Sequence, residues 1–346
     1  MICDEIHNAL AAQVAGYDAE QICVVADDKI ALDTDYPTLR MAVSEGGKNL
    51  ESVSRIWDFL FEHGITRRGI LVCIGGGVLT DLGGFAASTY KRGIDYINVP
   101  TTLLAMIDAS SGGKTSINYR GLKNSIGTFA PPVATLICPT WLRTLPAPQM
   151  LSGFGEMLKT GLIDVHRDKR QGTRDHLWNR LLQYDLDAMP VDALTPLIEA
   201  CVEVKRRIVE TDPKEIGLRK VLNFGHTFGH ALEEVPGDES RVTGEMPHGY
   251  AVVYGMIAEL YLSVTLLGCP KEPLQQLTQL MLHHYGKPQC KCSDMERLVT
   301  LMQQDKKNEH SAEINCTLLQ APGEPVINQV ITAEQAAEAW EYLFSL

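Results

Sequence analysis

The distribution of apolar residues changes near residue 146, and this change constrains the fold more than any other feature of the sequence. Before it, a segment of helical spacing at residues 50–61 lies among short apolar runs, which are QICVVA (21–26), GILVCI (69–74), DYINVP (95–100) and ATLICP (134–139). Apolar runs that alternate with helices are typical of a parallel sheet covered on both faces. We therefore expect an α/β domain over residues 1–146.

Helical patterns dominate the rest of the chain and predict a mostly α-helical second domain over residues 147–346. Thr195 and Pro196 are typical of the N-cap and the first position of a helix. Thr332 and Gln335 have the spacing of a capping box before the last helix. The most apolar run, residues 251–258, ends at Glu259 and is too short to span a membrane.

The composition is that of an ordinary globular protein. Its 346 residues are 45% hydrophobic and 21% charged, which is enough for two domains. With 31 basic and 43 acidic residues the formal charge is −12, which argues against a nucleic-acid partner. Nine cysteines without a CxxC pair, and a first segment without a basic stretch, predict a reduced, cytoplasmic protein.

Three glycines, residues 75–77, follow one of the predicted strands and precede a helical pattern that contains Asp81. Such a turn lets backbone N–H groups approach the phosphates of a nucleotide. A tight turn that merely needs glycine is the alternative. Asp27, at the end of the first predicted strand, is placed to bind ribose hydroxyls. A plain surface turn is the alternative there.

Several basic residues suit an anionic ligand. In the stretch DASSGGKT (108–115), Lys114 lies beside small residues, and Lys123 follows soon after. The helical half adds further cations that could hold a phosphate or a carboxylate: Lys159, Lys205, Arg219, Lys306 and Lys307. Taken singly, each of these is more typical of a solvated surface charge.

His226 and His230 lie four residues apart, so that on a helix both imidazoles lie on one face. His248 follows, and Glu156 could add a carboxylate. Three such donors with one open position are typical of catalytic zinc. Spacing favours His226 and His230 as joint ligands, as in HExxH enzymes, but the pattern alone does not choose among the four, and structural histidines are the alternative.

Taken together, six stretches resemble the 3-dehydroquinate synthases of the sugar-phosphate cyclase family. They are GGGVLTDLGGFAASTYKRG (75–93), VPTTLLAMIDASSGGKTSIN (99–118), GLKNSIGTF (121–129), SGFGEMLKTGLI (152–163), GLRKVLNFGHTFGHALEE (217–234) and HGYAV (248–252). The resemblance runs from about residue 27 to residue 307. It implies a Rossmann-like NAD-binding domain followed by an α-helical metal- and substrate-binding domain, with zinc as the usual metal and cobalt as the other candidate.

Carried over by position, the resemblance implies a role for individual residues. NAD would contact Asp27, Glu45, Lys48, Gly76, Gly77, Val78, Asp81, Thr101, Thr102, Lys123 and Thr144. Glu156, His226 and His248 would hold the metal. His230 would then lie near the substrate and would not bind the metal. The catalytic set would be Lys159, His230, Asn223 and Asp108. The substrate would be bound by Lys114, Asn124, Lys205, Arg219, one lysine of the pair Lys306 and Lys307, and Arg92 from the partner subunit of a homodimer.

The family's reaction explains this mixture of residues. Its substrate, 3-deoxy-D-arabino-heptulosonate 7-phosphate, is transiently oxidised by NAD at a hydroxyl that the metal stabilises. Phosphate then leaves by β-elimination, and re-reduction and an intramolecular aldol step give 3-dehydroquinate for the shikimate pathway. The substrate phosphate can itself act as the base, so the protein chiefly positions the substrate and stabilises charge.

Other functions agree less well with the sequence. Another sugar-phosphate cyclase, making a valiolone, an inosose or an amino-sugar-derived ring, would differ at the carboxylate end of its substrate. A metal-dependent polyol dehydrogenase would need no phosphate pocket, so Arg92, Lys114 and Lys159 count against it. An inactive regulator is disfavoured because every carried-over charged position is intact.

The chain departs from the family's usual pattern at three positions, Ser111, Ser116 and Tyr250. The family commonly has valine at the position of Ser111, alanine or glycine at that of Ser116, and glutamate at that of Tyr250. We expect these changes to tune the approach of the substrate rather than to abolish activity.

Overall fold

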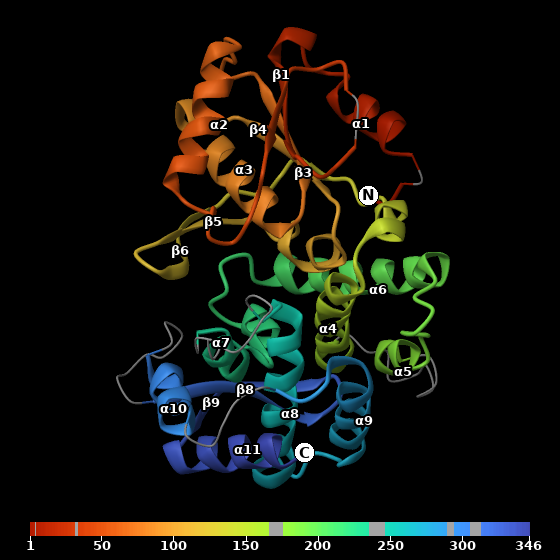
Figure 1. Ribbon diagram of the computed structural model, residues 1–346, viewed down its shortest axis with the longest axis vertical. Coiled ribbons are helices and arrows are strands. Elements are labelled where there is room, and N and C mark those ends of the chain that lie inside the picture. Colours follow the sequence, from red (N-terminus) through yellow and green to blue (C-terminus); the bar gives the residue numbers. More distant parts are fainter. Residues whose placement is uncertain (4, 32–33, 166–175, 235–245, 289–293, 305–312) are drawn as a thin grey trace. The chain divides into compact units, whose positions relative to one another are not determined.

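The computed structural model describes residues 1–3, 5–31, 34–165, 176–234, 246–288, 294–304 and 313–346 (Figure 1). Two of the predicted substrate-binding residues, Lys306 and Lys307, lie outside the described residues. The chain divides into two compact units, Met1–Pro146 and Ala147–Leu346. Each unit has its own architecture.

The first unit is built on a five-stranded parallel sheet with the strand order β2-β1-β3-β4-β7, which confirms the predicted α/β fold. Its elements in chain order are α1 (Ile6–Val14), η1 (Ala19–Gln21), β1 (Ile22–Asp27), β2 (Thr38–Met41), α2 (Leu50–Glu62), β3 (Ile70–Gly75), α3 (Gly77–Thr89), η2 (Tyr90–Arg92), β4 (Asp95–Pro100), η3 (Ala105–Ala109), β5 (Lys114–Tyr119), β6 (Leu122–Phe129), β7 (Ala134–Thr135) and η4 (Pro139–Thr144).

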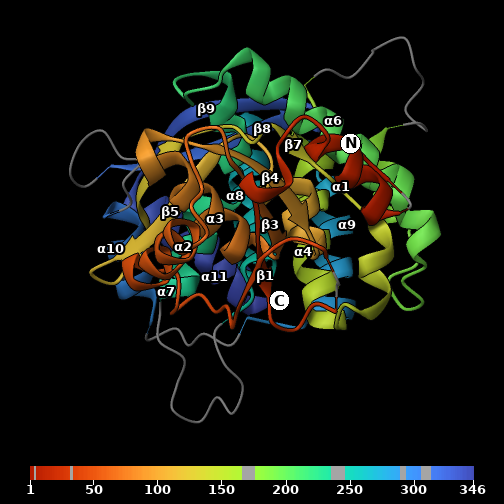
Figure 2. The same ribbon diagram turned by 90° about the horizontal axis from the view of Figure 1, so that it is seen from above.

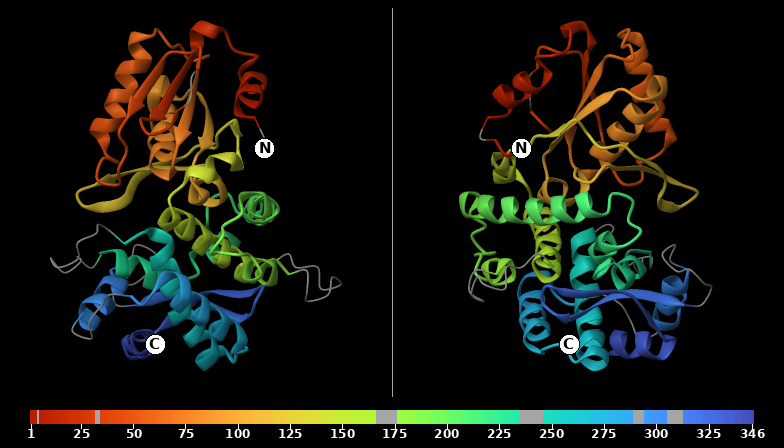
Figure 3. Two further views of the ribbon diagram at one scale, coloured as in Figure 1. Left: turned by 45° about the vertical axis from the view of Figure 1, so that its right-hand side comes forward. Right: turned by 180° about the vertical axis from the view of Figure 1, so that it is seen from behind.

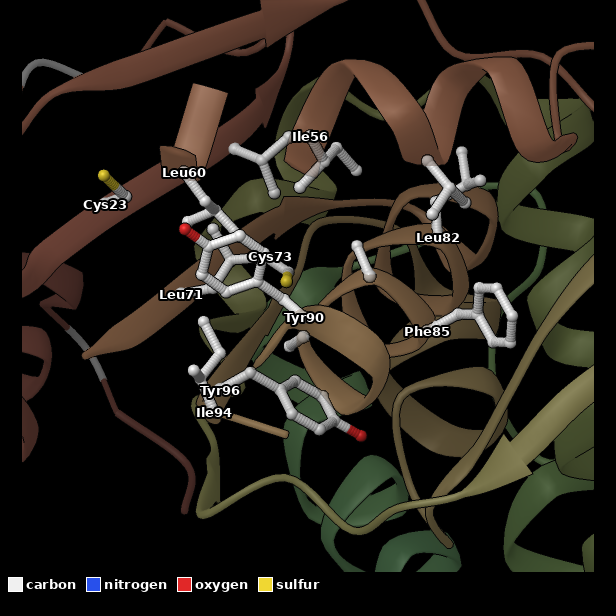
Figure 4. Close-up of a cluster of buried hydrophobic side chains, with 14 of the residues drawn as sticks. Cys23, Ile56, Leu60, Leu71, Cys73, Leu82, Phe85, Tyr90, Ile94 and Tyr96 are labelled. Carbon is white, nitrogen blue, oxygen red and sulfur yellow. The ribbon is translucent and has the colours of Figure 1, made fainter. Parts of the chain in front are cut away.

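Successive side chains of a strand point to opposite faces of a sheet, and this gives the first unit two hydrophobic clusters. On one face, Cys23 and Leu71 of the strands pack with Ile56 of α2 and Leu82 of α3 (Figure 4). On the other face, strand residues pack against α1. Figure 2 shows α1 on one side of the sheet and α2 and α3 on the other. Because both faces are covered, β1 and β3 are almost entirely apolar.

Two features of this unit differ from the expectation. The strand predicted at residues 134–139 is reduced to the two residues of β7. Beyond it Ile137 pairs with Ile2, and Pro139, which has no N–H to donate to a strand ladder, begins the 3-10 helix η4. An antiparallel hairpin of β5 and β6 is also present. The sequence does not predict this hairpin, because β6 is exposed along nearly its whole length and lacks the apolar run of a buried strand.

The second unit is mostly α-helical, as expected. Its capping box at Thr332 and Gln335 is confirmed. The elements are α4 (Ala147–Ile163), α5 (Leu177–Leu182), α6 (Val191–Thr211), η6 (Leu218–Asn223), α7 (His226–Glu234), α8 (His248–Leu267), α9 (Glu272–Leu280), η7 (Met281–Tyr285), α10 (Met295–Gln303), β8 (Ile314–Ala321), β9 (Glu324–Ile331) and α11 (Ala333–Ser345).

Helix α8 is central to the second unit and contacts α4, α7, α9, α11 and β8. Its 20 residues include a window with a mean hydropathy of 1.6, so by length and composition it is apolar enough to cross a membrane. However, 67% of that window is buried inside the structure. A helix that is apolar on all sides and surrounded by other elements is a core helix.

Helix α6 begins one turn earlier than the sequence predicts. It starts at Val191 with Pro190 as its N-cap residue, so that Pro196 lies inside the helix rather than at its first position. The Thr195 hydroxyl donates to the carbonyl of Val191 at 3.2 Å and does not cap the helix. A proline so near the helix start removes only one backbone hydrogen bond, which the packing of the following turns outweighs.

Strands β8 and β9 form a hairpin that the sequence analysis does not predict (Figure 3). They are joined at Pro322 and Gly323, a dipeptide typical of turns, with Gly323 at a φ of 80°. The hydroxyl of Ser263 in α8 accepts a hydrogen bond from the backbone nitrogen of Leu319 at 2.9 Å. The hairpin is stabilised by this contact with α8, which no local pattern reveals.

Candidate functional site

The glycine turn lies at the edge of the sheet where the parallel strands end, the usual place for a nucleotide. Gly76 is the N-cap residue of α3, and Gly77 is its first residue. A Cβ on Gly77 would lie 2.9 Å from Cβ of Ala109, and one on Gly76 would lie 3.2 Å from Cγ2 of Thr102. The turn therefore needs glycine, and its bare backbone at a helix start suits the phosphates of NAD.

Other predicted cofactor residues lie at the ends of elements of the same unit. Asp27 ends β1, and burial raises the pKa of its carboxyl. Thr101 and Thr102 follow β4 directly, Val78 lies in the first turn of α3, and Thr144 ends η4. Of the residues predicted to contact the substrate, Arg92 ends η2, Asp108 lies in η3 and Lys114 begins β5, while the predicted cofactor residue Lys123 lies in β6.

A polar network joins the segment before α2, helix α3 and the β5–β6 hairpin. Nζ of Lys48 lies 2.5 Å from Oδ2 of Asp81 and 2.5 Å from Oδ1 of Asn124. The hydroxyl of Ser116 donates to the same two side chains at 3.3 and 2.8 Å. Burial raises the pKa of Asp81, and the ammonium of Lys48 acts against that rise. Predicted cofactor and substrate residues are thus linked, and Ser116, one of the three departures, is part of the link.

Asn118 belongs to this network although the sequence analysis does not single it out. Its Nδ2 donates to Oε1 of Glu45 at 2.8 Å, and its Oδ1 accepts from the backbone nitrogen of Asn124 at 2.8 Å. Asn124 has a φ of 52°, in the left-handed region that costs a non-glycine residue free energy. Asparagine tolerates this region better than most residues, and the bond from Asn118 holds Asn124 in it.

Glu156, His226 and His248 come from three helices, and one donor atom of each lies within 4.8 Å of the others. Oε1 of Glu156 lies 3.5 Å from Nε2 of His226 and 3.4 Å from Nε2 of His248. Among the described residues, no donor meets either Glu156 oxygen in hydrogen-bond geometry, although Nζ of Lys159 lies 2.5 Å from Oε2. Donor atoms on a tetrahedral zinc ion lie roughly 3.3 Å apart. A cation therefore fits these three residues.

Glycines next to these three residues allow their helices to approach closely. A Cβ on Gly249 would lie 1.8 Å from the carbonyl oxygen of Ser152 in α4, and one on Gly155 would lie 2.5 Å from the carbonyl oxygen of Gly249. Gly225 has a φ of 80°, and its Cβ would lie 2.6 Å from Cγ of Met256. Backbone-to-backbone packing of this kind is open only to glycine. It brings the carboxylate and the two imidazoles together.

The second nitrogen of each imidazole faces an acceptor. Nδ1 of His226 lies 3.1 Å from the carbonyl oxygen of Phe224, and Nδ1 of His248 lies 3.3 Å from Oε2 of Glu233. A proton on Nδ1 leaves Nε2 to bind a cation. Burial lowers the pKa of His248, but the carboxylates of Glu156 and Glu233 outweigh it and raise the pKa to about 10. In the metal-free protein this ring therefore carries a second proton, and a cation that binds Nε2 displaces it.

Replacing Glu233 with alanine is expected to weaken zinc binding by about 10- to 100-fold, because outer partners of metal-binding histidines contribute on that scale. Competition with a chromophoric chelator measures the affinity. Glu233→Gln keeps an acceptor oxygen and should lose less. Glu234→Ala, at the exposed neighbouring position in the same helix, is the matched control. Equal zinc affinities for Glu233→Ala and Glu234→Ala would contradict this role.

His230 lies one turn after His226 in α7, and their ring centroids are 5.3 Å apart, while the centroids of His230 and His248 are 6.3 Å apart. The close group of donor atoms comprises Glu156, His226 and His248 and does not include His230. The i,i+4 spacing therefore places His230 beside the candidate metal centre.

Three basic residues predicted to bind the substrate are buried in the second unit. Lys159, Lys205 and Arg219 are only 2%, 7% and 1% exposed. Removing a cation from water costs several kcal/mol unless anions accompany it. Each residue taken alone is typical of a surface charge, but the structure buries all three, and Lys159 is paired with Glu156.

The loop that leads to Arg219 is organised by two acidic residues that the sequence analysis does not predict. The carboxylate of Asp212 accepts hydrogen bonds from the backbone nitrogens of Ile216, Gly217 and Arg219. Burial acts to raise the pKa of Asp212, but these donors outweigh it and lower the pKa. The only local signal is the turn-forming dipeptide Asp212-Pro213.

Glu215, in the same loop, contacts one of the predicted catalytic residues. Its Oε1 accepts a hydrogen bond from Nδ2 of Asn223 at 3.2 Å. Glu215 itself has a φ of 60°, a strained backbone conformation for a glutamate. The contact orients the Asn223 amide.

Over most of its length this chain is similar to one family of known proteins. The N-terminal model of 3-dehydroquinate synthase matches residues 38–152, and the C-terminal model matches residues 153–308. A 3-dehydroquinate synthase of Parabacteroides distasonis is 43% identical over 306 residues, which cover 88% of this chain and 83% of that protein. One of Clostridium acetobutylicum is 35% identical over 341 residues, with 94% and 90% covered.

Solved structures show the same architecture. A 2-epi-5-epi-valiolone synthase from Streptomyces hygroscopicus, with NAD+ and Zn2+ bound, has a TM-score of 0.80 at 27% identity, covering 100% of this chain and 96% of that one. A 2-deoxy-scyllo-inosose synthase with carbaglucose-6-phosphate, NAD+ and Co2+ has 0.77 at 22%, covering 95% and 93%. A probable glycerol dehydrogenase from Sinorhizobium meliloti has 0.63 at 18%, covering 99% and 95%. The last two indicate a shared fold alone.

Proposed function

Because the chain belongs to the 3-dehydroquinate synthase family, we propose that it converts 3-deoxy-D-arabino-heptulosonate 7-phosphate into 3-dehydroquinate and phosphate. It is an enzyme, a carbon–oxygen lyase that eliminates phosphate. The convergence of Glu156, His226 and His248 within a chain that both family models match carries this proposal. When bound, NAD supplies a hydride acceptor and donor, and a zinc or cobalt ion supplies a Lewis acid at the reacting hydroxyl.

The protein's own residues bind, orient and neutralise the substrate. Glu156, His226 and His248 hold the cation, and the glycine turn with its neighbouring Asp27, Lys48 and Asp81 holds the nucleotide. The buried cations Lys159, Lys205 and Arg219 balance the carboxylate and phosphate of a doubly anionic substrate. The remaining contacts come from Asp108, Lys114, Asn124, Asn223, His230 and the Lys306–Lys307 pair. Fixed charges of this kind stabilise a developing oxyanion without a conventional general base.

The assay uses purified protein, heptulosonate phosphate and catalytic amounts of NAD, with phosphate release as the readout. We expect release that stops when a chelator removes the metal and resumes when zinc is restored. No release from the metal-replete protein would refute the proposal. Equal turnover of a sugar phosphate without a carboxylate would favour another cyclase of the valiolone or inosose type. Stoichiometric accumulation of NADH would favour a polyol dehydrogenase.

A homodimer in which Arg92 reaches the partner's site is part of the proposal. The β5–β6 hairpin exposes apolar side chains, among them Leu122, Ile126 and Phe129, which suit contact with a second copy. Arg92 itself is exposed at the end of η2.

Complementation tests the action of Arg92 across the dimer. Arg92→Ala and Lys159→Ala proteins are each expected to be inactive. Co-expressed, they should recover about a quarter of wild-type activity, because half of the dimers are mixed and each mixed dimer has one intact site. No recovery in purified mixed dimers would place Arg92 in its own subunit's site.

We place the enzyme in the cytoplasm. The described cysteines, which exclude Cys290 and Cys292, are all free thiols, as expected in a reducing compartment.

A further inference from the structure

A second group of metal-binding side chains lies in the second unit, separate from Glu156, His226 and His248. It consists of Asp187, in the segment after α5, and His283 and His284 in η7, and one donor atom of each lies within 4.8 Å of the others. The proposed reaction gives these three residues no role.

The geometry of this group resembles that of the candidate metal centre. Oδ2 of Asp187 lies 3.9 Å from Nε2 of His283, and Oδ1 lies 3.7 Å from Nδ1 of His284. These separations are too long for hydrogen bonds. They are close to the roughly 3.3 Å between donors on a tetrahedral zinc ion. Since the Asp187 side chain is 79% exposed, it can move the few tenths of an ångström that coordination requires.

The segment that carries Asp187 is held in place. Oδ1 of Asp185 accepts hydrogen bonds from the backbone nitrogens of Asp187 and Ala188, both at 3.0 Å. Nearby, Nε1 of Trp178 in α5 donates to Oε1 of Gln276 in α9 at 2.9 Å. The carboxylate is therefore presented on a fixed turn, next to the helix that leads into η7.

The turn that carries the two histidines is also held in place. They lie in a π-helical turn, a rare form that is frequent at functional sites. Their rings meet edge to face with centroids 4.4 Å apart. The turn is anchored by Tyr285, whose hydroxyl donates to the carbonyl of Leu151 at 2.8 Å and whose carbonyl accepts from Tyr254 at 3.1 Å.

The charges also suit a cation. The carboxylates of Asp187 and Asp185 both lie close enough to interact with His284. A neutral imidazole is the form that binds a metal. The two carboxylates offset the charge of a divalent ion.

We propose that Asp187, His283 and His284 form a second divalent-metal site, which takes zinc or a similar ion that prefers imidazole with carboxylate. Water completes the coordination because the site is open to solvent. The bound ion ties the segment after α5 to η7 and stabilises the second unit. It takes no part in the elimination of phosphate.

Zinc titration of metal-stripped, full-length protein tests the site. Wild type is expected to bind two equivalents, and His283→Ala/His284→Ala one, with the affinity for the lost equivalent reduced at least tenfold. Glu156→Ala should keep the equivalent that the double variant loses. Wild type should also show a rise in its unfolding temperature at the second equivalent, which the double variant lacks.

Matched controls keep the result specific. His7→Ala removes an exposed histidine elsewhere, and Cys290→Ser/Cys292→Ser removes two thiols close in sequence; both should bind two equivalents. A single equivalent in wild type that Glu156→Ala abolishes, or two in the His283→Ala/His284→Ala protein, would overturn the proposal, as would loss of the second equivalent with the cysteines. The number of zinc equivalents does not depend on phosphate release. The proposed second metal site can therefore be refuted without refuting the proposed activity, and the reverse also holds.

Discussion

Replacing Glu156 with alanine is expected to remove the metal from the candidate centre and to lower phosphate release by about a thousandfold. The carboxylate is the only anionic member of the donor group Glu156, His226 and His248 among the described residues. A bound cation contributes several kcal/mol of charge stabilisation, and about 4 kcal/mol corresponds to that factor. Metal content by elemental analysis and phosphate release in the presence of NAD measure the two effects.

Two further variants separate metal loss from misfolding. Glu156→Gln keeps the volume of the side chain, so it should lose the metal with a smaller change in the free energy of unfolding. Glu203→Ala removes an exposed glutamate of α6 in the same unit and should leave metal content and rate unchanged. Full metal content in the Glu156→Ala protein would contradict the assignment of this ligand.

Replacing Gly249 with alanine is expected to destabilise the second unit by about 3 kcal/mol and to weaken metal binding at the same time. The new Cβ would lie 1.8 Å from the carbonyl oxygen of Ser152 and 2.5 Å from its carbonyl carbon. Both are backbone atoms, which no side-chain rotation can move away. Helix α8 must therefore shift from α4, which separates His248 from Glu156. Denaturant unfolding and chelator competition measure the two effects.

Gly16→Ala is the control for Gly249→Ala. A Cβ on Gly16 meets nothing within 4 Å, so this change should alter the free energy of unfolding by less than about 0.5 kcal/mol. If Gly249→Ala unfolded at the same denaturant concentration as wild type, the close approach of α4 and α8 would be wrong.

Most of the fold could be predicted from the sequence because its elements are locally encoded. The buried strands β1 and β3 are nearly continuous apolar runs, and the last helix begins with a capping box that needs only two side chains. The two hairpins could not be predicted in this way. β6 is exposed, and β8 depends on a hydrogen bond from Leu319 to Ser263, far away in the sequence. The start of α6 could not be predicted from Pro196 either, because packing along the helix outweighs the local preference of proline for a helix start.

The resemblance to the family implies the residues of the candidate centre. It does not imply the residues that hold them in position. Glu233 lies behind His248, Asn118 holds Asn124, and Glu215 orients the amide of Asn223. Each of these contacts spans a turn or loop whose path depends on other elements. A supporting residue carries no motif of its own, so only its distance to the residue it supports identifies it.

The sequence by itself determined that His226 and His230 share one face of a helix, because the helical repeat relates residues four apart whatever surrounds them. Which donors can meet around one ion was decided by tertiary structure. Coordination needs atoms about 3.3 Å apart, and these come from α4, α7 and α8. The backbones of these helices touch where glycine replaces a side chain. The spacing within one helix therefore suggested a pair, and the packing of three helices selected Glu156, His226 and His248.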